Sequence, residues 1–177
     1  MEFNRLLSSA ISAYGEPKLS GSENNFKSTE KQKPINNKDY YLITDINEID
    51  KWIEEAEEVG EVAVDTETNS LDPHQADLVG ISLCSKIGKA CYIPVGHKSS
   101  NCLNKKSVID KLKNLLEDPS VKKIGQNIKF DFIVFYKLGI SLSSMEDTML
   151  MSYVLDAGKN RHNMDTLSDI HLGHKTI

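Results

Sequence analysis

The sequence contains no apolar run that approaches the ~20 residues needed to span a membrane. Its N-terminus, with Glu2 and Asn4 close to the start, lacks the layout of a secretory signal peptide. Cysteine is scarce, and Cys84, Cys91 and Cys102 show no metal-binding spacing; the first two fall in apolar segments that favour buried free thiols. We therefore expect a cytoplasmic protein without membrane contacts or a disulfide framework.

Positive charge is also in short supply. The chain has 21 Lys and Arg residues against 26 Asp and Glu residues, and its formal net charge is -5. A protein that holds nucleic acid on a broad basic surface carries the opposite excess. Any nucleic acid must therefore be held by bound cations and by local contacts.

What the chain does have is a pair of acidic residues at the end of an apolar segment. Asp65 and Glu67 follow the run Val62, Ala63, Val64. Residues two apart on a strand point to the same face, so the two carboxylates should project together and repel each other. Such hard oxygen ligands suit Mg²⁺ or Mn²⁺. The pair alone is ambiguous, because Asp-x-Glu at a strand end is also common on solvated surfaces.

A third acidic residue favours the metal interpretation. Asp131 follows the short apolar segment 121–125, which we predict as a strand, and it opens a predicted helix over 132–138. It should therefore lie at the end of an element, where ligand sites of α/β sheets collect.

The chain is similar to a known family, and the similarity extends over six blocks. The blocks are 64–72 (VDTETNSLD), 92–97 (YIPVGH), 125–131 (GQNIKFD), 147–150 (DTML), 161–167 (RHNMDTL) and 174–177 (HKTI). They resemble the 3′-to-5′ proofreading exonuclease domain of bacterial DNA polymerase I, a member of the DEDD exonucleases. The resemblance runs from about Tyr40 to the last residue, and it implies an enzyme.

The element pattern agrees with the fold that this resemblance implies. We predict strands at 40–43, 61–66, 78–84, 90–94, 121–125 and 144–146, and helices at 46–58, 108–116, 132–138, from Asp147 to Gly158 and from Asp165 to Gly173. The second to fourth strands should form an antiparallel meander. The expected fold is α/β, a ribonuclease-H-like mixed sheet flanked by helices.

The resemblance also implies domain boundaries and a gap. Residues 1–39 look like the tail of a preceding 5′-nuclease domain plus a flexible linker, and residues 40–177 like the exonuclease domain. In the family, a third acidic motif on a late helix, a Tyr followed four residues later by an Asp, lies beyond the matching segment. We therefore expect three of four carboxylates, a missing terminal helix, and weak or no cleavage by this chain.

The mechanism expected from these parts is hydrolysis of a phosphodiester assisted by two Mg²⁺ or Mn²⁺ ions. We assign Asp65 to a position that bridges both ions, Glu67 to the ion beside the attacking water, and Asp131 to the other ion, in part through water. The expected partners are the 3′ end of single-stranded DNA and the remainder of a polymerase chain.

The resemblance assigns substrate contacts to five more residues, and most have a plain alternative. Leu71 would be an apolar wedge against the terminal base, or a core leucine. Gln126 and Asn127 would contact the terminal sugar and phosphate, or cap the helix near Asp131. Phe130 stands where tyrosine is frequent in the family, so it could stack on a base without a hydroxyl contact.

Arg161 suits a phosphate because its guanidinium donates two parallel hydrogen bonds, while the alternative is a solvated loop arginine. Asp147 resembles an acidic residue common in the DEDD group, but a helix cap explains it without chemistry.

Two other functions stay open. One is a ribonuclease-D-like 3′-to-5′ exoribonuclease, and the other is a non-catalytic remnant of a split polymerase that still binds single strands.

Overall fold

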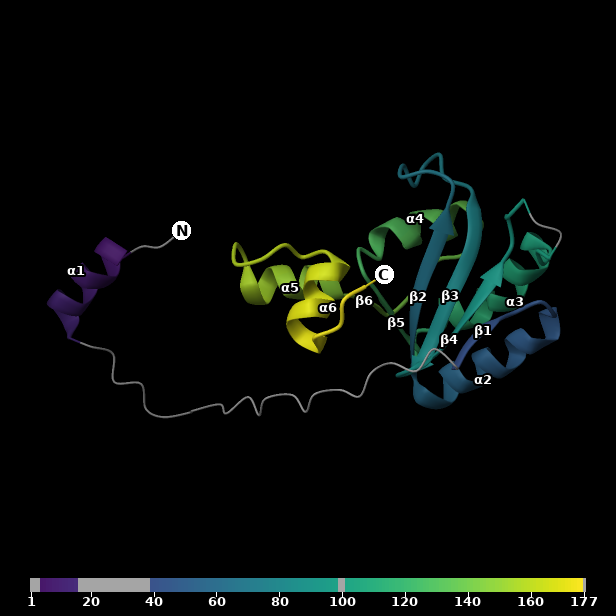
Figure 1. Ribbon diagram of the computed structural model, residues 1–177, viewed down its shortest axis with the longest axis horizontal. Coiled ribbons are helices and arrows are strands. Elements are labelled where there is room, and N and C mark those ends of the chain that lie inside the picture. Colours follow the sequence, from purple (N-terminus) through teal and green to yellow (C-terminus); the bar gives the residue numbers. More distant parts are fainter. Residues whose placement is uncertain (1–3, 16–38, 99–100, 177) are drawn as a thin grey trace.

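The computed structural model describes residues 4–15, 39–98 and 101–176. Residues 39–176 form an α/β domain around one mixed sheet, as predicted (Figure 1). The strands are β1 (Tyr40–Leu42), β2 (Glu61–Thr68), β3 (Leu78–Lys86), β4 (Lys89–Pro94), β5 (Lys122–Gly125) and β6 (Met145–Asp147). The helices are α1 (Asn4–Tyr14), the 3₁₀ turn η2 (Ile46–Glu48), α2 (Ile49–Val59), α3 (Lys105–Glu117), α4 (Lys129–Lys137), α5 (Thr148–Asp156) and α6 (Met164–Leu172).

The sheet has the strand order β1-β4-β3-β2-β5-β6. The strands β2, β3 and β4 form the predicted antiparallel meander. β5 pairs parallel with β2, and β6 pairs parallel with β5. Parallel pairs require crossover connections, which α3 and α4 provide here. Because β2 and β5 are parallel, their C-terminal ends lie at the same end of the sheet, and α4 begins just after β5.

The core lies between the sheet and the helices α2 and α3, which run on the same side of it (Figure 1). Asn104 caps the first turn of α3 by accepting from Ser107 N, and the buried residues of this helix are Val108, Ile109, Leu112, Leu115 and Leu116. Along β2 the burial alternates: Val62, Val64 and Thr66 are buried. The carboxylates of Asp65 and Glu67 therefore leave the opposite face, as the spacing of two requires.

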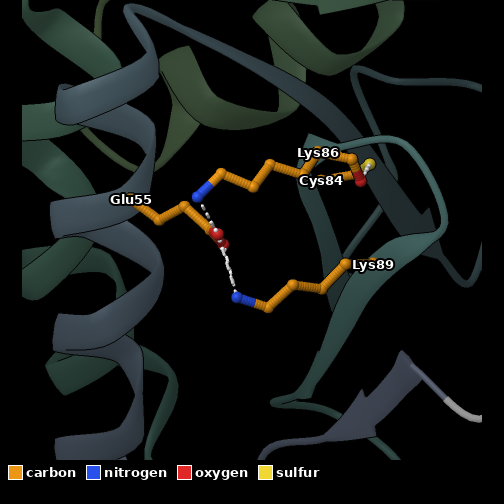
Figure 2. A network of polar contacts seen from close by, with 4 residues as sticks. All are labelled: Glu55, Cys84, Lys86 and Lys89. Atoms are coloured by element: carbon orange, nitrogen blue, oxygen red, sulfur yellow. Dashed lines mark hydrogen bonds and ion pairs between the residues drawn. The ribbon is translucent and has the colours of Figure 1, made fainter.

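An ion-pair cluster around the buried Glu55 connects α2 to the β3–β4 hairpin (Figure 2). Glu55 on α2 accepts from Lys86 Nζ and from Lys89 Nζ, each at 2.8 Å. Lys89 Nζ also lies 5.0 Å from the ring centre of Trp52. The hydrogen bonds from Lys86 and then Lys89 lower the pKa of Glu55. We call these three charged residues the Glu55 cluster; the sequence did not predict it.

Some element boundaries differ from the prediction. α4 begins at Lys129, so Asp131 lies inside its first turn instead of before it. α6 is capped by Asn163, which accepts from Thr166 N, and Asp165 follows within the first turn. The helix α1 was not predicted, because its 11 residues were assigned to a tail. Residues 16–38, which make up most of the predicted linker, fall outside the described residues.

Two further observations concern the cysteines and the expected absence of a membrane-spanning segment. Cys91 is buried as predicted, whereas Cys84 is half-buried and its thiol donates to Lys86 O. Within the described part of the chain, no helix combines the length and apolarity needed to cross a membrane.

Candidate metal and nucleic-acid site

Asp131 is fixed beside the acidic pair of β2. Thr66, which stands between Asp65 and Glu67, donates its backbone N–H to Asp131 Oδ1 at 2.9 Å and its hydroxyl to the same oxygen at 2.6 Å. Both residues are buried, with 7% and 3% of their surface exposed. Two donors on one oxygen orient the carboxylate. The structure therefore brings Asp131, which is 65 residues away in the sequence from Thr66, to the predicted pair.

The electrostatics of the three carboxylates are unfavourable in the absence of a cation. Burial raises the pKa of Asp131 to about 6, the bonds from Thr66 oppose this, and the charge of Asp65 adds to it. Burial also raises the pKa of Asp65, and the charge of Glu67 raises it further. A carboxylate that is desolvated and placed next to others of the same charge is destabilised as an anion. A bound divalent cation would relieve this.

The donor chemistry fits a hard divalent ion, although the carboxylates do not form a closed shell. Across residues 4–15, 39–98 and 101–176, no group of three or more His, Cys, Asp or Glu side chains lies close enough together to hold a metal ion. The carboxylates nevertheless influence one another's pKa, as described above. Because Mg²⁺ keeps several of its waters, one or two carboxylates per ion suffice, with water as the remaining ligands.

A cleft of about 500 Å³ opens beside the carboxylates. It is lined by Asp65, Thr66, Glu67, Thr68, Asn69, Ser70, Leu71 and Phe130. The side chain of Leu71 is 97% exposed, which rules out the alternative that it is a core leucine. Phe130 is half-buried and packs against the core. The cleft therefore combines acidic groups with two apolar surfaces.

Asn127 adopts a strained backbone conformation beside the site. Its φ of 59° lies in the left-handed region, which is uncommon for a residue other than glycine. Asp147 holds this conformation by accepting from Asn127 N at 3.0 Å and from Ile128 N at 3.1 Å. The same carboxylate caps α5 through Met149 N and Leu150 N. The cap interpretation of Asp147 is thus confirmed, and the same carboxylate also binds the backbone N–H groups of Asn127 and Ile128.

The side chain of Gln126 forms hydrogen bonds with other residues of the domain. Its Oε1 accepts from the hydroxyl of Thr148 at 2.5 Å, and its Nε2 donates to His162 O at 2.7 Å. His162 is buried, with Nδ1 2.7 Å from Ser152 Oγ. Gln126 therefore connects β5 to the segment before α6, and a contact with substrate stays a prediction. Arg161, next to His162, is exposed.

Comparisons with known proteins identify the family of the chain. The sequence profile of a family described as 3′-5′ exonuclease matches residues 40–177. The chain belongs to this 3′-5′ exonuclease family. It is 42% identical over 165 residues to DNA polymerase I of Rhizobium leguminosarum, covering 81% of this chain, and 42% identical over 145 residues to DNA polymerase I of Pseudomonas aeruginosa, covering 78% of this chain.

The chain spans 16% of the length of both of these polymerases. Solved structures share its fold. A structure titled "Brucella melitensis NrnC with bound Mg2+" has a TM-score of 0.59 at 22% identity and covers 78% of this chain and 63% of that one. Trypanosoma brucei RNase D in complex with RNA U12 has a TM-score of 0.63 at 15% identity, covering 78% and 49%. The ribonuclease-H-like fold expected from the sequence is confirmed.

Proposed function

We propose that this domain removes nucleotides one at a time from the 3′ end of single-stranded DNA, as the proofreading part of a DNA polymerase I. The observation that carries the proposal is the pair of hydrogen bonds from Thr66 to Asp131. They hold the Asp131 carboxylate against Thr66, the residue between Asp65 and Glu67 on β2. The relatives that are DNA polymerases support DNA as the substrate and the rest of a polymerase chain as the partner.

Asp65, Glu67 and Asp131 are the residues that would hold two Mg²⁺ or Mn²⁺ ions. When bound, such ions lower the pKa of an attacking water and stabilise the leaving oxygen of a phosphodiester. Asp65 interacts electrostatically with both other carboxylates: the charge of Glu67 raises the pKa of Asp65, and the charge of Asp65 raises the pKa of Asp131. The buried Thr66 contributes by donating two hydrogen bonds to Asp131 Oδ1, which leaves Oδ2 as the oxygen that would bind a ligand.

The cleft supplies the contacts for the DNA terminus in this proposal. Leu71 and Phe130 would contact the terminal base, since apolar and aromatic surfaces accept any base without sequence preference. The side chain of Asn127, on its clamped backbone, would contact the sugar or phosphate, and Gln126 would assist. Arg161 would bind a phosphate of the incoming strand. A frayed 3′ end is favoured because unpairing a mismatched base costs little.

The test is cleavage of 5′-labelled single-stranded DNA by the chain in Mn²⁺, read as a ladder shortened from the 3′ end. Asp65→Asn should lower the rate about 1,000-fold, since losing one of the carboxylate charges that would hold the ions removes several kcal/mol of metal-assisted stabilisation. Asp110→Asn, an exposed aspartate on α3, is the matched control and should cleave like the wild type. Cleavage that survives Asp65→Asn would refute the assignment.

Because we expect weak cleavage from this chain, binding should be measured in parallel. In Ca²⁺, the chain should bind a single-stranded DNA oligomer more tightly than in EDTA, and Asp65→Asn should remove the difference. An RNA oligomer of the same sequence tests the ribonuclease alternative that the RNase D fold similarity raises. Preference for RNA would contradict the proposal, and binding with no cleavage in Mn²⁺ would favour the non-catalytic alternative.

A further inference from the structure

The ring of Tyr92 on β4 lies across the neighbouring strand β3 at Gly80. A Cβ atom at position 80 would stand 1.9 Å from Tyr92 Oη and 2.2 Å from Cζ. The tyrosine hydroxyl therefore occupies the space that any other side chain at position 80 would need. Glycine is required here so that the hydroxyl can extend across β3 toward β2, the next strand of the sheet (Figure 1).

The residue on β2 that faces this hydroxyl is Glu67. Gly80 and Glu67 are directly opposed in the antiparallel pair. Opposed residues point to the same face, with Cβ atoms roughly 4.5–5.5 Å apart. Tyr92 Oη is therefore roughly 3–7 Å from the Cβ of Glu67, within the reach of a glutamate carboxylate. In agreement, the pKa of Tyr92 is raised first by burial and then by the charge of Glu67.

A second group holds the hydroxyl in place. His97 Nε2 lies 2.6 Å from Tyr92 Oη, and the two rings meet edge to face with centroids 5.7 Å apart. The chain reaches His97 through a bend after β4, in which the N–H groups of Val95 and Gly96 both donate to Val79 O at 2.9 Å. His97 is thus anchored to β3 on the side of the sheet that carries the site.

We propose that Tyr92 and His97 position Glu67 for metal binding: the Nε2–H of His97 donates to Tyr92 Oη, and the tyrosine hydroxyl donates to the Glu67 carboxylate. This rests on the proposed function, in which Glu67 is a metal ligand. A neutral imidazole has one N–H donor, and when it donates to the phenol oxygen, the phenol proton is left for another acceptor. Hydrogen bonds of this kind orient ligating carboxylates and tune metal affinity.

The first experiment measures Mn²⁺ binding by the EPR signal of the free ion, so that no cleavage is needed. Tyr92→Phe keeps the ring over Gly80 and removes the hydroxyl, and it should weaken Mn²⁺ binding about tenfold. His97→Ala should also weaken binding, and His97→Gln, whose amide can still donate, should bind more tightly than His97→Ala. Tyr136→Phe, which removes the hydroxyl of a tyrosine that is 65% exposed on α4, should leave binding unchanged. Equal melting temperatures in EDTA establish that each variant is folded.

The second experiment asks whether Tyr92 acts through Glu67. Adding Tyr92→Phe to Glu67→Gln should change Mn²⁺ affinity no further, because the carboxylate that the hydroxyl orients is already absent. Wild-type affinity in Tyr92→Phe, or an equal loss in the Glu67→Gln background, would overturn the positioning role. Failure of the proposed function itself looks different: Asp65→Asn would then bind Mn²⁺ as the wild type does.

Discussion

Glu55 and Asp131 are both buried carboxylates, with 8% and 3% of their surface exposed, but their neighbours carry opposite charges. Glu55 lies between two lysines at the far end of β3 (Figure 2). Asp131 lies beside Asp65 at the other end of the sheet and is held by a threonine. As a result, the pKa of Glu55 is lowered, whereas that of Asp131 is raised to about 6.

The difference separates a charge that is neutralised within the fold from one that is not. The ionised Glu55 has its countercharges within the fold, so it stabilises the packing of α2 on the hairpin. The ionised Asp131 has neutral donors and another carboxylate instead, so its charge opposes folding at neutral pH. A fold retains such an arrangement where a ligand of opposite charge compensates it, which is why strongly perturbed carboxylates in a cleft indicate a site.

The largest expected effect on stability comes from neutralising Asp131. Asp131→Asn keeps an oxygen for the two Thr66 donors and removes the buried charge. We expect it to raise the free energy of unfolding at pH 8 in EDTA by about 3 kcal/mol, since its pKa rises from 3.8 to about 6 and one unit corresponds to about 1.4 kcal/mol. Urea denaturation measures this, and Asp110→Asn on α3 should change nothing.

The pH dependence of this effect has a definite sign. The native state holds the Asp131 proton more tightly than the unfolded state does, so the wild type is most favoured below pH ~4 and loses this advantage as the pH rises through about 6. The gain from Asp131→Asn should therefore disappear at pH 4. An equal gain at pH 4 and pH 8 would show that packing, not charge, is responsible.

Breaking the Glu55 cluster should have the opposite sign and a smaller size. Glu55→Gln should lower the free energy of unfolding at pH 7 by about 1 kcal/mol, because the side chains of Lys86 and Lys89 are 51% and 42% exposed and the pairs are partly screened. Since the pKa of Glu55 is lowered on folding, its contribution is present above pH ~4.5 and is lost as the pH falls further. Thermal unfolding at pH 7 and pH 3 measures this, with exposed Glu54→Gln as the control.

The hydroxyl of Thr66 is one of the two donors that offset the unfavourable charge of Asp131, and its contribution can be measured. Thr66→Val removes the hydroxyl that accompanies the backbone N–H on Asp131 Oδ1. It should cost up to about 1 kcal/mol of unfolding free energy at pH 8 and less at pH 4, where the carboxylate is protonated. It should also weaken Mn²⁺ binding several-fold, and Thr66→Ser should restore both properties. A serine variant as impaired as the valine variant would show that the methyl group matters instead.

The smallest effect on stability is expected from two exposed apolar side chains, one at each end of the sheet. Leu71 beside the carboxylates is 97% exposed, and Ile87 beside the Glu55 cluster is 91% exposed. Replacing either with alanine should change the unfolding free energy by less than about 0.5 kcal/mol. Leu71→Ala should nevertheless weaken single-stranded DNA binding about fivefold in Ca²⁺, a loss of about 1 kcal/mol, while Ile87→Ala should not. Equal DNA binding by both variants would show that Leu71 does not contact the DNA.

The placement of Asp65 and Glu67 on a strand and of Asp131 at an element end could be predicted because its signals are local. The spacing of Asp65 and Glu67 on a strand determines that they share a face, and an apolar segment before Asp131 indicates an element end. The hydrogen bonds from Gln126 to His162 and from Asn127 to Asp147 could not be predicted, since they span 36 and 20 residues. A polar side chain in a sequence shows what it can donate or accept, but not which partner the fold brings to it.

The sequence by itself determined the class of fold, the alternation of buried and exposed residues along β2, and the chemistry that three carboxylates can support. These follow from the periodicity of strands and helices and from motifs of adjacent residues. The tertiary structure determines which side chains become neighbours. The parallel pairing of β5 with β2 brings Asp131 to Thr66, the antiparallel pairing of β3 with β4 lays Tyr92 over Gly80, and the antiparallel pairing of β2 with β3 places Gly80 opposite Glu67. Strand order and register bring these residues together although they are distant in the sequence.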